Sequence, residues 1–343
     1  MSPTARTRKT ALVIGATGSF GAHAAQALIK HGWTVRALAR NPEAAARQSG
    51  PRTPIEWVKG DAMVAAQVLA AARGADLIIH AANPAGYHNW KGLVVPMLQN
   101  ALEAAMAVDA RLVLPGNVYN FAPDSGPAIA EGAPQAPATR KGALRVEMER
   151  RLRSACERGA RVLILRAGDF FGPAAPNSSL AWLTTRRGSR LTGIRRAGPA
   201  DVGHAFAYLP DLAETLARLV DAEDRLGRFE DFHFRGHWLQ GENDMACAIR
   251  RASGRADVPI GDFPWAVVLA LSPVVEMFRE LWEMRYLWRR PIGLDNARLT
   301  AFLGAEPHTP IDAALRATLS DMGVLEETPA ARPPQIHQLP RAA

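Results

Sequence analysis

The chain has 343 residues, of which 48% are hydrophobic and 22% are charged, and its formal net charge at pH 7 is +8. This balance is typical of a globular enzyme and excludes an intrinsically disordered chain. A basic chain suggests a nucleic-acid partner, but five of the excess positive charges lie near the two ends, which leaves three for the interior. Those five are Arg6, Arg8, Lys9, Arg332 and Arg341. The sequence therefore predicts no nucleic-acid partner.

The first half of the chain alternates short apolar runs with longer helical segments. Strands are predicted at residues 10–14, 33–39, 55–58, 75–80, 110–114 and 161–166. Helices are predicted between them, at residues 22–30, from residue 42, and at 63–73, 91–108 and 139–158. Strands joined by helices of this length form parallel sheets with right-handed crossovers. The predicted fold class is therefore α/β, a Rossmann-type doubly wound parallel sheet with helices on both faces.

The second half is less regular and predicts a smaller C-terminal substrate lobe. Residues 174–205 read as an extended excursion. Helices are predicted at residues 209–220, 243–252 and 310–322, a strand at 229–234, and one or two helices at 263–288 broken at Pro273. The expected domains are a disordered tail at 1–9, a Rossmann domain at 10–173 to which elements around 204–235 return, a lobe that forms most of 174–327, and a disordered tail at 328–343.

A glycine-rich turn directly follows the first predicted strand and opens the first helix. Its residues are Gly15, Ala16, Thr17, Gly18, Ser19, Phe20 and Gly21. The first glycine permits a tight turn, the second lets backbone approach a pyrophosphate, and the third lets helix and strand pack closely. The helix N-terminus adds N–H donors and a positive dipole end. Strand, turn and helix in this order predict a dinucleotide-binding site.

The GxxGxxG spacing and the strand order resemble the short-chain dehydrogenase/reductase superfamily, in its extended or atypical branch of NAD-dependent epimerase/dehydratase-like proteins. The resemblance covers residues 10–173 well. It implies adenine contacts after the third strand, a dinucleotide-lining turn after the fourth, and a nicotinamide-lining stretch after residue 166. The residues at these places are Asp61 and Ala62, then Ala81, Ala82 and Asn83, then Gly168, Asp169 and Phe170.

The end of the second strand bears on the choice of cofactor. It carries Arg40 and has no acidic residue before Glu43. An acidic side chain there would bind a ribose 2′-hydroxyl, whereas an arginine favours a 2′-phosphate. The sequence thus favours NADP(H) over NAD(H). Arg36 is an alternative phosphate ligand, and Arg40 as a solvated loop residue is the other reading.

The family's catalytic Tyr-x-x-x-Lys dyad is missing from the helix that should carry it. Alignment of this helix places Lys141 at the tyrosine and Arg145 at the lysine, and no tyrosine occurs between Tyr119 and Tyr208. Lys141 is a candidate proton donor or a ligand of the cofactor ribose, and a solvated helix face is the alternative. The two cations lie one helical turn apart and together fit a phosphate or an oxyanion.

Three further residues are candidates for the catalytic site. Asn117 lies near the position of the family's serine, and Tyr119 follows it. A literal Tyr-x-x-x-Lys occurs at Tyr87 to Lys91, in the loop after the fourth strand. This loop borders the nicotinamide in relatives, so Tyr87 is a candidate relocated proton donor. An aromatic packing turn is the alternative role.

These observations favour an NADP(H)-dependent oxidoreductase or epimerase-like enzyme that acts on a carbonyl or hydroxyl of a small molecule. A non-catalytic NADP(H)-binding redox sensor is the alternative. The sequence shows no metal-binding motif. Two cysteines and the lack of an apolar N-terminal segment favour a cytoplasmic protein, and no apolar run is long enough to predict a membrane partner. A homodimer through the helices at 91–108 and 139–158 is left open.

Overall fold

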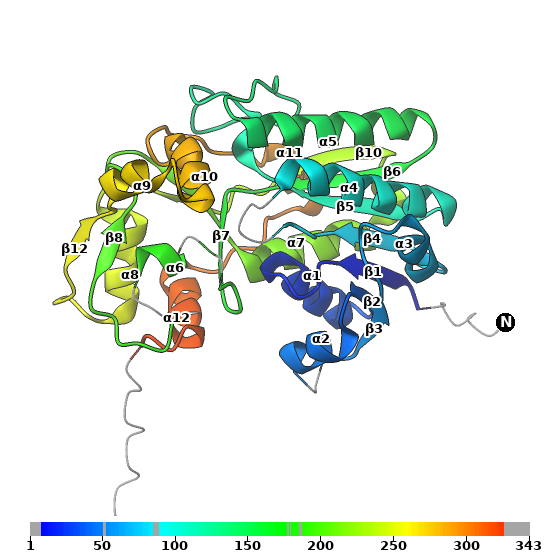
Figure 1. Ribbon diagram of the computed structural model, residues 1–343, viewed down its shortest axis with the longest axis horizontal. Helices are drawn as coiled ribbons and strands as arrows, with labels where there is room; N and C mark the ends of the chain where they lie inside the picture. The colour runs from blue at the N-terminus through cyan, green and yellow to red at the C-terminus, as the bar shows by residue number, and fades with distance from the viewer. Residues whose placement is uncertain are drawn as a thin grey trace, which may run out of the picture.

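The computed structural model describes residues 8–50, 53–84, 89–176, 178, 180–184 and 187–325. Seven parallel strands form its main sheet, in the order β10-β6-β5-β4-β1-β2-β3 (Figure 1). Their bounds are β1 Thr10–Ile14, β2 Thr34–Ala39, β3 Ile55–Lys59, β4 Leu77–His80, β5 Arg111–Gly116, β6 Arg161–Arg166 and β10 Phe229–His233. The predicted doubly wound α/β fold is confirmed. Most of the two predicted tails lies outside the described residues.

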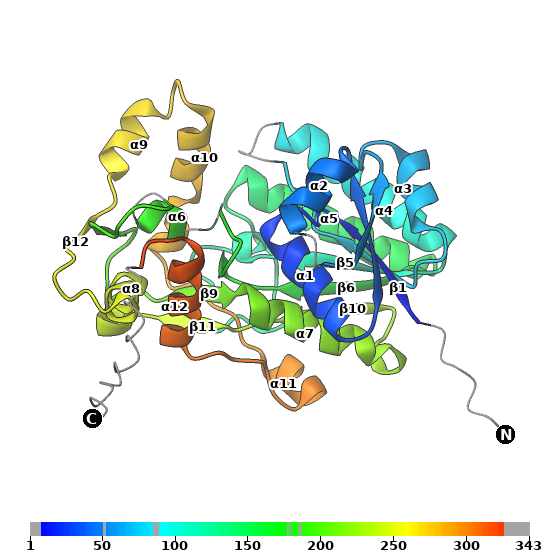
Figure 2. The ribbon, with the colours of Figure 1, turned by 90° about the horizontal axis from the view of Figure 1, so that it is seen from below.

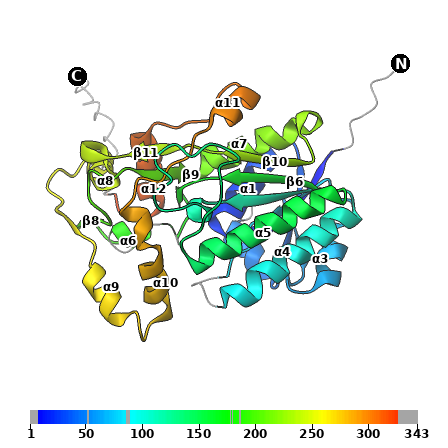
Figure 3. The same ribbon diagram turned by 90° about the horizontal axis from the view of Figure 1, so that it is seen from above.

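Helices cover both faces of this sheet because its central strands are apolar along most of their length and buried on both faces. In β1, Ala11 and Val13 face one core cluster while Leu12 and Ile14 face the other. The first face is covered by α1 Ser19–Lys30, α7 Leu209–Asp221 and α11 Ala297–Leu303. The second is covered by α3 Ala65–Ala72, α4 Trp90–Ala107 and α5 Arg140–Glu157, which lie side by side in Figure 3. Helix α2 spans Pro42–Ser49.

Two helix starts show how local sequence sets these elements. The side chain of Asn41 accepts a hydrogen bond from the amide of Ala44 (3.0 Å), and Pro42 occupies the first turn of α2, as the sequence predicts. Helix α1 begins at Ser19, three residues earlier than the prediction, with Gly18 as its N-cap residue. The glycine turn therefore delivers the chain directly into the first turn of α1.

The lobe is built from short elements, of which the helices near 243–252, 263–288 and 310–322 were predicted from the sequence and the strands were not. A three-stranded sheet contains β7 Asp169–Phe171, β9 His204–Tyr208 and β11 His237–Leu239, and a parallel pair contains β8 Ile194–Arg196 and β12 Ile260–Asp262. The lobe helices are α6 Leu180–Leu183, α8 Met245–Ser253, α9 Trp265–Leu271, α10 Glu276–Met284 and α12 Ile311–Asp321. Single 3-10 turns lie at η2 Val118–Asn120, η3 Glu223–Arg225, η4 Gly241–Asn243 and η5 Arg285–Trp288.

Two expectations for the second half need correction. Residues 174–205 contain α6 and β8 and are not simply extended. Of the elements near 204–235, α7 packs on α1 and β10 extends the main sheet, but β9 pairs with β7 and β11. The break at Pro273 is present between α9 and α10, and Figure 2 shows this helical pair standing away from the sheet.

A buried ionic cluster joins one half of the main sheet to its helices. Arg166, the last residue of β6, is fully buried and forms two hydrogen bonds of 2.9 Å with the carboxylate of Glu149 in α5. A second carboxylate, Asp231 in β10, lies 3.3 Å from the same guanidinium. Burial alone would lower the pKa of Arg166, but these two carboxylates raise it overall. The cluster therefore holds Arg166 in its charged form.

The remaining contacts of Arg166 reach the neighbouring strand ends. Its Nη1 donates to the carbonyl oxygen of Asn117 after β5 (2.9 Å), and its Nε donates to Nε2 of His233 in β10 (3.2 Å). Nδ1 of the same histidine is 3.0 Å from the carbonyl oxygen of Ile129. Arg166 thus fixes the carboxyl ends of β5, β6 and β10 relative to one another.

We predict that Glu149→Ala lowers the free energy of unfolding by about 3–5 kcal/mol, because it leaves the buried Arg166 with half of its counter-charge removed. Denaturant unfolding measures this change. The matched control is Glu147→Ala on the same helix, where the carboxylate pairs only with the exposed Arg150 and Arg151. This control should leave the unfolding midpoint nearly unchanged. Equal losses in both variants would contradict the account.

Candidate functional site

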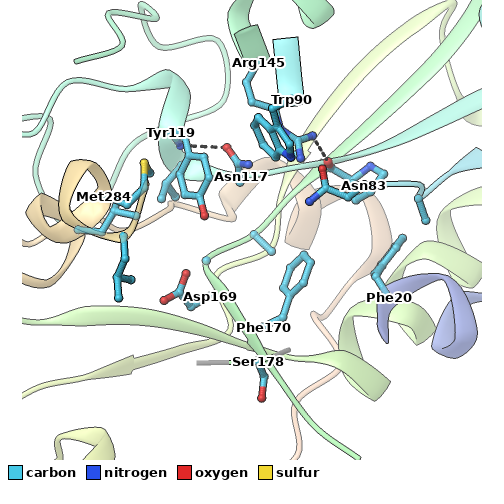
Figure 4. A pocket seen from close by; sticks show the side chains of 18 of the residues that line it. Phe20, Asn83, Trp90, Asn117, Tyr119, Arg145, Asp169, Phe170, Ser178 and Met284 are labelled. Atoms are coloured by element: carbon cyan, nitrogen blue, oxygen red, sulfur yellow. Dashed lines mark hydrogen bonds between the residues drawn. The ribbon is translucent and has the colours of Figure 1, made fainter. Parts of the chain in front are cut away.

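A cavity of about 340 Å³ lies between the carboxyl ends of β4, β5 and β6 and the lobe. Figure 4 shows the side chains that converge on it from both sides. In open α/β sheets, ligands bind beyond the carboxyl ends of the strands. The cavity occupies that place, and its lining joins residues of the sheet edge to residues of α6, α9–α10 and η5.

The glycine turn meets the backbone after β4 so closely that side chains are excluded. Gly15 has φ +95°, and a Cβ atom there would lie 2.6 Å from the carbonyl carbon of Ala81. A Cβ on Gly21 would overlap the carbonyl oxygen of Gly15. Gly18, in contrast, meets only that same oxygen at 3.3 Å, so its outer side is open. The turn therefore leaves the N-terminus of α1 accessible, as binding of a pyrophosphate requires.

The turn after β4 forms the floor of the cavity. His80, Ala81, Ala82 and Asn83 all line it. His80 was not anticipated from the sequence, although a polar residue at the end of an apolar strand is a usable signal. Its ring is buried, and neither ring nitrogen has a hydrogen-bond partner among the described residues. Burial, with a smaller effect of Arg145, lowers the pKa of His80 to about 4, so the ring is neutral near pH 7.

Asn117 and Tyr119 lie in the cavity wall after β5. The side-chain oxygen of Asn117 accepts a hydrogen bond from the amide of Tyr119 (3.0 Å), and this fixes η2. The hydroxyl of Tyr119 and the carboxylate of Asp169 are directed toward the same space in Figure 4. Asp169 also lies 3.0 Å from Nε2 of His204, whose ring stacks on Trp288 at 4.1 Å. These contacts orient two proton-exchanging groups into one cavity.

The two cations of α5 point in different directions. Arg145 lines the cavity, donates to the carbonyl oxygen of Pro115 (3.3 Å) and lies 5.4 Å from the ring centroid of Trp90. Lys141 is buried, and its Nζ lies 2.9 Å from Oε2 of Glu280 in α10. Lys141 is not among the residues that line the cavity.

The position of Lys141 corrects the expectation that both cations serve one ligand. Burial lowers the pKa of Lys141, and Glu280 opposes this effect. The ion pair joins α5 to the lobe. Lys141 is therefore placed as a structural link between the two halves of the molecule rather than as a proton donor or a ribose ligand.

Phe170 completes the wall opposite Tyr119. Its ring stacks on Phe20 of α1 with 6.1 Å between centroids, and both rings line the cavity. Gly168 precedes them in the lining, where a Cβ atom would overlap the carbonyl oxygen of Ala205. The stretch after β6 thus meets the first turn of α1 at the cavity wall.

The residues expected at the adenosine end lie farther along the sheet edge. Arg40 follows β2 and is exposed. Arg36 bonds to Glu56 and to two carbonyl oxygens at the end of α3, so its guanidinium is already engaged by the protein. Asp61 accepts from the amide of Met63, and the carbonyl oxygen of Ala62 accepts from Asn100.

Three further sequence expectations can be placed. Tyr87 lies outside the described residues. No group of three or more histidine, cysteine or acidic side chains within the described ranges is arranged to ligate a metal ion. In the same part of the chain, no helix is both long and apolar enough to traverse a bilayer.

The fold and the site together define a Rossmann-type α/β protein with a cavity between its sheet edge and a smaller lobe. The sequence from residue 11 to residue 233 matches the model of the NAD dependent epimerase/dehydratase family. The match spans more than half of the chain, and the chain therefore belongs to this family. A comparison with curated protein sequences gives no match.

Solved structures with the same fold include several sugar-nucleotide epimerases. UDP-N-acetylglucosamine 4-epimerase from Bacillus cereus has a TM-score of 0.70 at 15% identity, and the match covers 94% of this chain and 99% of the other. UDP-glucuronic acid 4-epimerase from Bacillus cereus, in complex with UDP-glucuronic acid and NAD, has a TM-score of 0.70 at 15% identity, and the match covers 91% of this chain and 98% of the other. UDP-glucose 4-epimerase from Bifidobacterium longum, in complex with NAD+ and UDP, has a TM-score of 0.68 at 16% identity, and the match covers 91% of this chain and 97% of the other. At these identities the likeness shows the fold alone.

We predict that the protein loses stability as the pH falls from 6.5 toward 4. The pKa of His80 is about 4 because of burial, and burial with Arg166 lowers that of His233 to about 4 as well. In this pH range the two histidines bind protons in the unfolded chain but stay neutral in the folded protein. Each histidine contributes a loss on the order of 1 kcal/mol per pH unit in that window. Urea unfolding at a series of pH values measures it.

In the variant His80→Phe, the drop in the free energy of unfolding from pH 7.5 to pH 5 should be smaller by on the order of 1 to 2 kcal/mol. His31→Gln is the contrast, because Asp221 and Glu214 outweigh burial and raise the pKa of His31. Its protonated form stabilises the fold at low pH, so this variant should lose stability at pH 5. An unchanged pH profile in His80→Phe would contradict the assignment.

Proposed function

We propose that the protein is an oxidoreductase or epimerase-like enzyme that uses a nicotinamide dinucleotide to act on a carbonyl or hydroxyl group of a small molecule. The observation that carries this proposal is one cavity that reaches Phe20, in the first turn of α1, and has Tyr119 and Asp169 in its wall. A dinucleotide-binding turn alone would serve a sensor equally well. A cavity that also offers proton-exchanging groups favours an enzyme.

The residues of the sheet edge fit a dinucleotide. The glycine turn and the α1 N-terminus would hold the pyrophosphate, and Asp61 with Ala62 lies where the adenine would be. Ala81 to Asn83 and Gly168 to Phe170 would border the nicotinamide. No acidic residue occupies the first turn of α1, so its positive dipole end is not neutralised there. When bound, the nicotinamide supplies hydride exchange at its C4 atom.

The choice between the two dinucleotides depends on Arg40. Its exposed position directly after β2 supports NADP(H), since an arginine there can pair with a 2′-phosphate. Two of the solved structures named above contain NAD, and this favours the other cofactor. Titration of the protein with NADPH and NADH separates the two proposals directly: tighter binding of NADPH supports the role of Arg40.

We assign the proton exchange with the substrate to Tyr119. It is the one tyrosine among the described residues that line the cavity. Its direction toward the space shared with Asp169, and the fixing of η2 by Asn117, support this role. Arg145 would lie on the same side and stabilise a developing negative charge on the substrate oxygen. A cytoplasmic location and a homodimer through α4 and α5 stay predictions from the sequence.

We predict that Gly18→Asp weakens NADPH binding at least about tenfold, because its carboxylate would face the pyrophosphate. The fold should persist, since Gly18 has φ −85° and aspartate is a favoured N-cap residue. Fluorescence titration and thermal melting measure the two effects. The control is Gly261→Asp, which adds the same charge on exposed β12 with open space around it. Unchanged NADPH binding in Gly18→Asp would overturn the assigned site.

We predict that Tyr119→Phe lowers kcat by about 10²–10⁴-fold while NADPH binding is retained, because the variant removes only the exchanging hydroxyl. Oxidation of NADPH in the presence of a carbonyl substrate provides the assay. Tyr208→Phe is the matched control, because Tyr208 is buried against Phe171 and does not line the cavity. Equal turnover in both variants would remove Tyr119 as the proton donor. Tight NADPH binding without turnover of any carbonyl compound would favour the sensor.

A further inference from the structure

The lobe side of the cavity differs in character from the sheet side. Beyond residue 178, every described residue of the lining is apolar or aromatic. The largest of them are Trp182, Phe263, Trp265, Met284, Leu287 and Trp288. They come from α6, from the segment before α9, from α9 and α10, and from η5. Several distant parts of the lobe therefore contribute one kind of surface to one chamber.

Among these side chains, the indole N–H of Trp265 is already used in a hydrogen bond. Nε1 of Trp265 donates to the carbonyl oxygen of Ala197 (2.6 Å). Trp288 is held by stacking on His204, with 4° between the ring planes. Met284 and Leu287 are buried. The chamber thus presents ring faces and aliphatic groups, with few donors to bind a hydroxylated sugar.

Arginines near the lobe wall are engaged elsewhere. The guanidinium of Arg285 lies 3.6 Å from the ring centroid of Trp282, outside the lining. Arg196 pairs with Asp244, and Arg279 lies 3.7 Å from the carboxylate of Glu280. Arg289 and Arg290 line a separate hollow next to Glu283. None of these cations faces the chamber, although a diphosphate would need such partners.

The charged groups that do line the cavity lie on its sheet side. They are Arg145 and Asp169, with neutral His80 below them. Asp169 borders the lobe wall through its contact with His204. A carboxylate at this boundary disfavours an anionic substrate, and an apolar wall gives a buried phosphate no compensation for its lost hydration.

From this division we infer that the lobe chamber takes the apolar body of an uncharged ketone, aldehyde or secondary alcohol, and that a sugar nucleotide is not the substrate. The inference rests on the proposed function, since it names the substrate class of that same site. The cavity is small for a ligand site and must also accept the nicotinamide. A substrate with one or two aromatic rings, or a short aliphatic chain, therefore fits best.

The test compares three ligands by calorimetry on the protein loaded with NADP+, which cannot transfer a hydride to a ketone. 4-Methylacetophenone is the neutral probe, 4-acetylbenzoate is its charged counterpart of similar shape, and UDP-glucose represents the sugar nucleotides. We expect the neutral ketone to bind more than about tenfold more tightly than either anion, because no cation lies among the described residues of the lobe wall. Tighter binding of UDP-glucose, or no binding of the neutral ketone up to its solubility limit, overturns the inference.

A second experiment introduces a positive charge into the lobe wall. Leu281→Lys places a cation in the lining and should reduce the preference for 4-methylacetophenone over 4-acetylbenzoate by more than about tenfold. Val274→Lys is the control, because Val274 lies between α9 and α10, is 79% exposed and does not line the cavity. It should keep the original preference. An unchanged preference in Leu281→Lys, with its melting temperature and NADPH affinity preserved, overturns the inference.

Failure of the proposed function has a different signature. In that case NADPH itself does not bind to the unliganded protein, and Gly18→Asp has no effect on it. If NADPH binds and only the ligand preference is reversed, the dinucleotide site stands and the substrate class is wrong.

Discussion

The guanidinium of Arg166 is the contact on which the arrangement of the site depends. A buried charge is tolerated only when opposite charges and hydrogen bonds surround it, and these come from α5, β10 and the chain after β5. Satisfying one side chain thereby fixes the strand ends from which Asn117, Tyr119 and Asp169 extend. A second ion pair, between Lys141 and Glu280, joins the same helix α5 to the lobe. The position of the lobe wall over the sheet edge is thus linked to the same core.

The cavity combines two surfaces made by different means. Its sheet side carries the polar and charged groups, among them Asn83, Arg145 and Asp169, on residues that follow the main strands or lie in α5. Its lobe side is formed by large apolar side chains from short helices and the segments between them. Family members can share the first surface and differ in the second, because the second depends on side chains and not on strand order. The fold therefore supports the cofactor assignment more directly than it supports any substrate borrowed from sugar-nucleotide epimerases.

Local sequence was sufficient to predict the main sheet and the glycine turn. Both depend on residues that are neighbours in the chain, such as the apolar run of β1 and the spacing of Gly15, Gly18 and Gly21. The orientation of Lys141 could not be predicted in this way, because its partner Glu280 is 139 residues away in the chain. The lobe chamber could not be predicted either, because its wall comes from segments far apart in the chain. The three-residue strands of the lobe are also too short to show an alternation of apolar and polar residues. His80 was overlooked although it ends an apolar strand, the place where a polar residue most often faces a ligand.

A crystal structure of the protein with NADPH and 4-methylacetophenone tests the central claim most directly. The account predicts the pyrophosphate at Gly18, the nicotinamide between Phe170 and Tyr119, and the aromatic ring of the ketone against Trp265. The ketone carbonyl carbon should lie within about 3.5 Å of nicotinamide C4. A dinucleotide bound away from the glycine turn, or a ketone outside the chamber, would contradict the account.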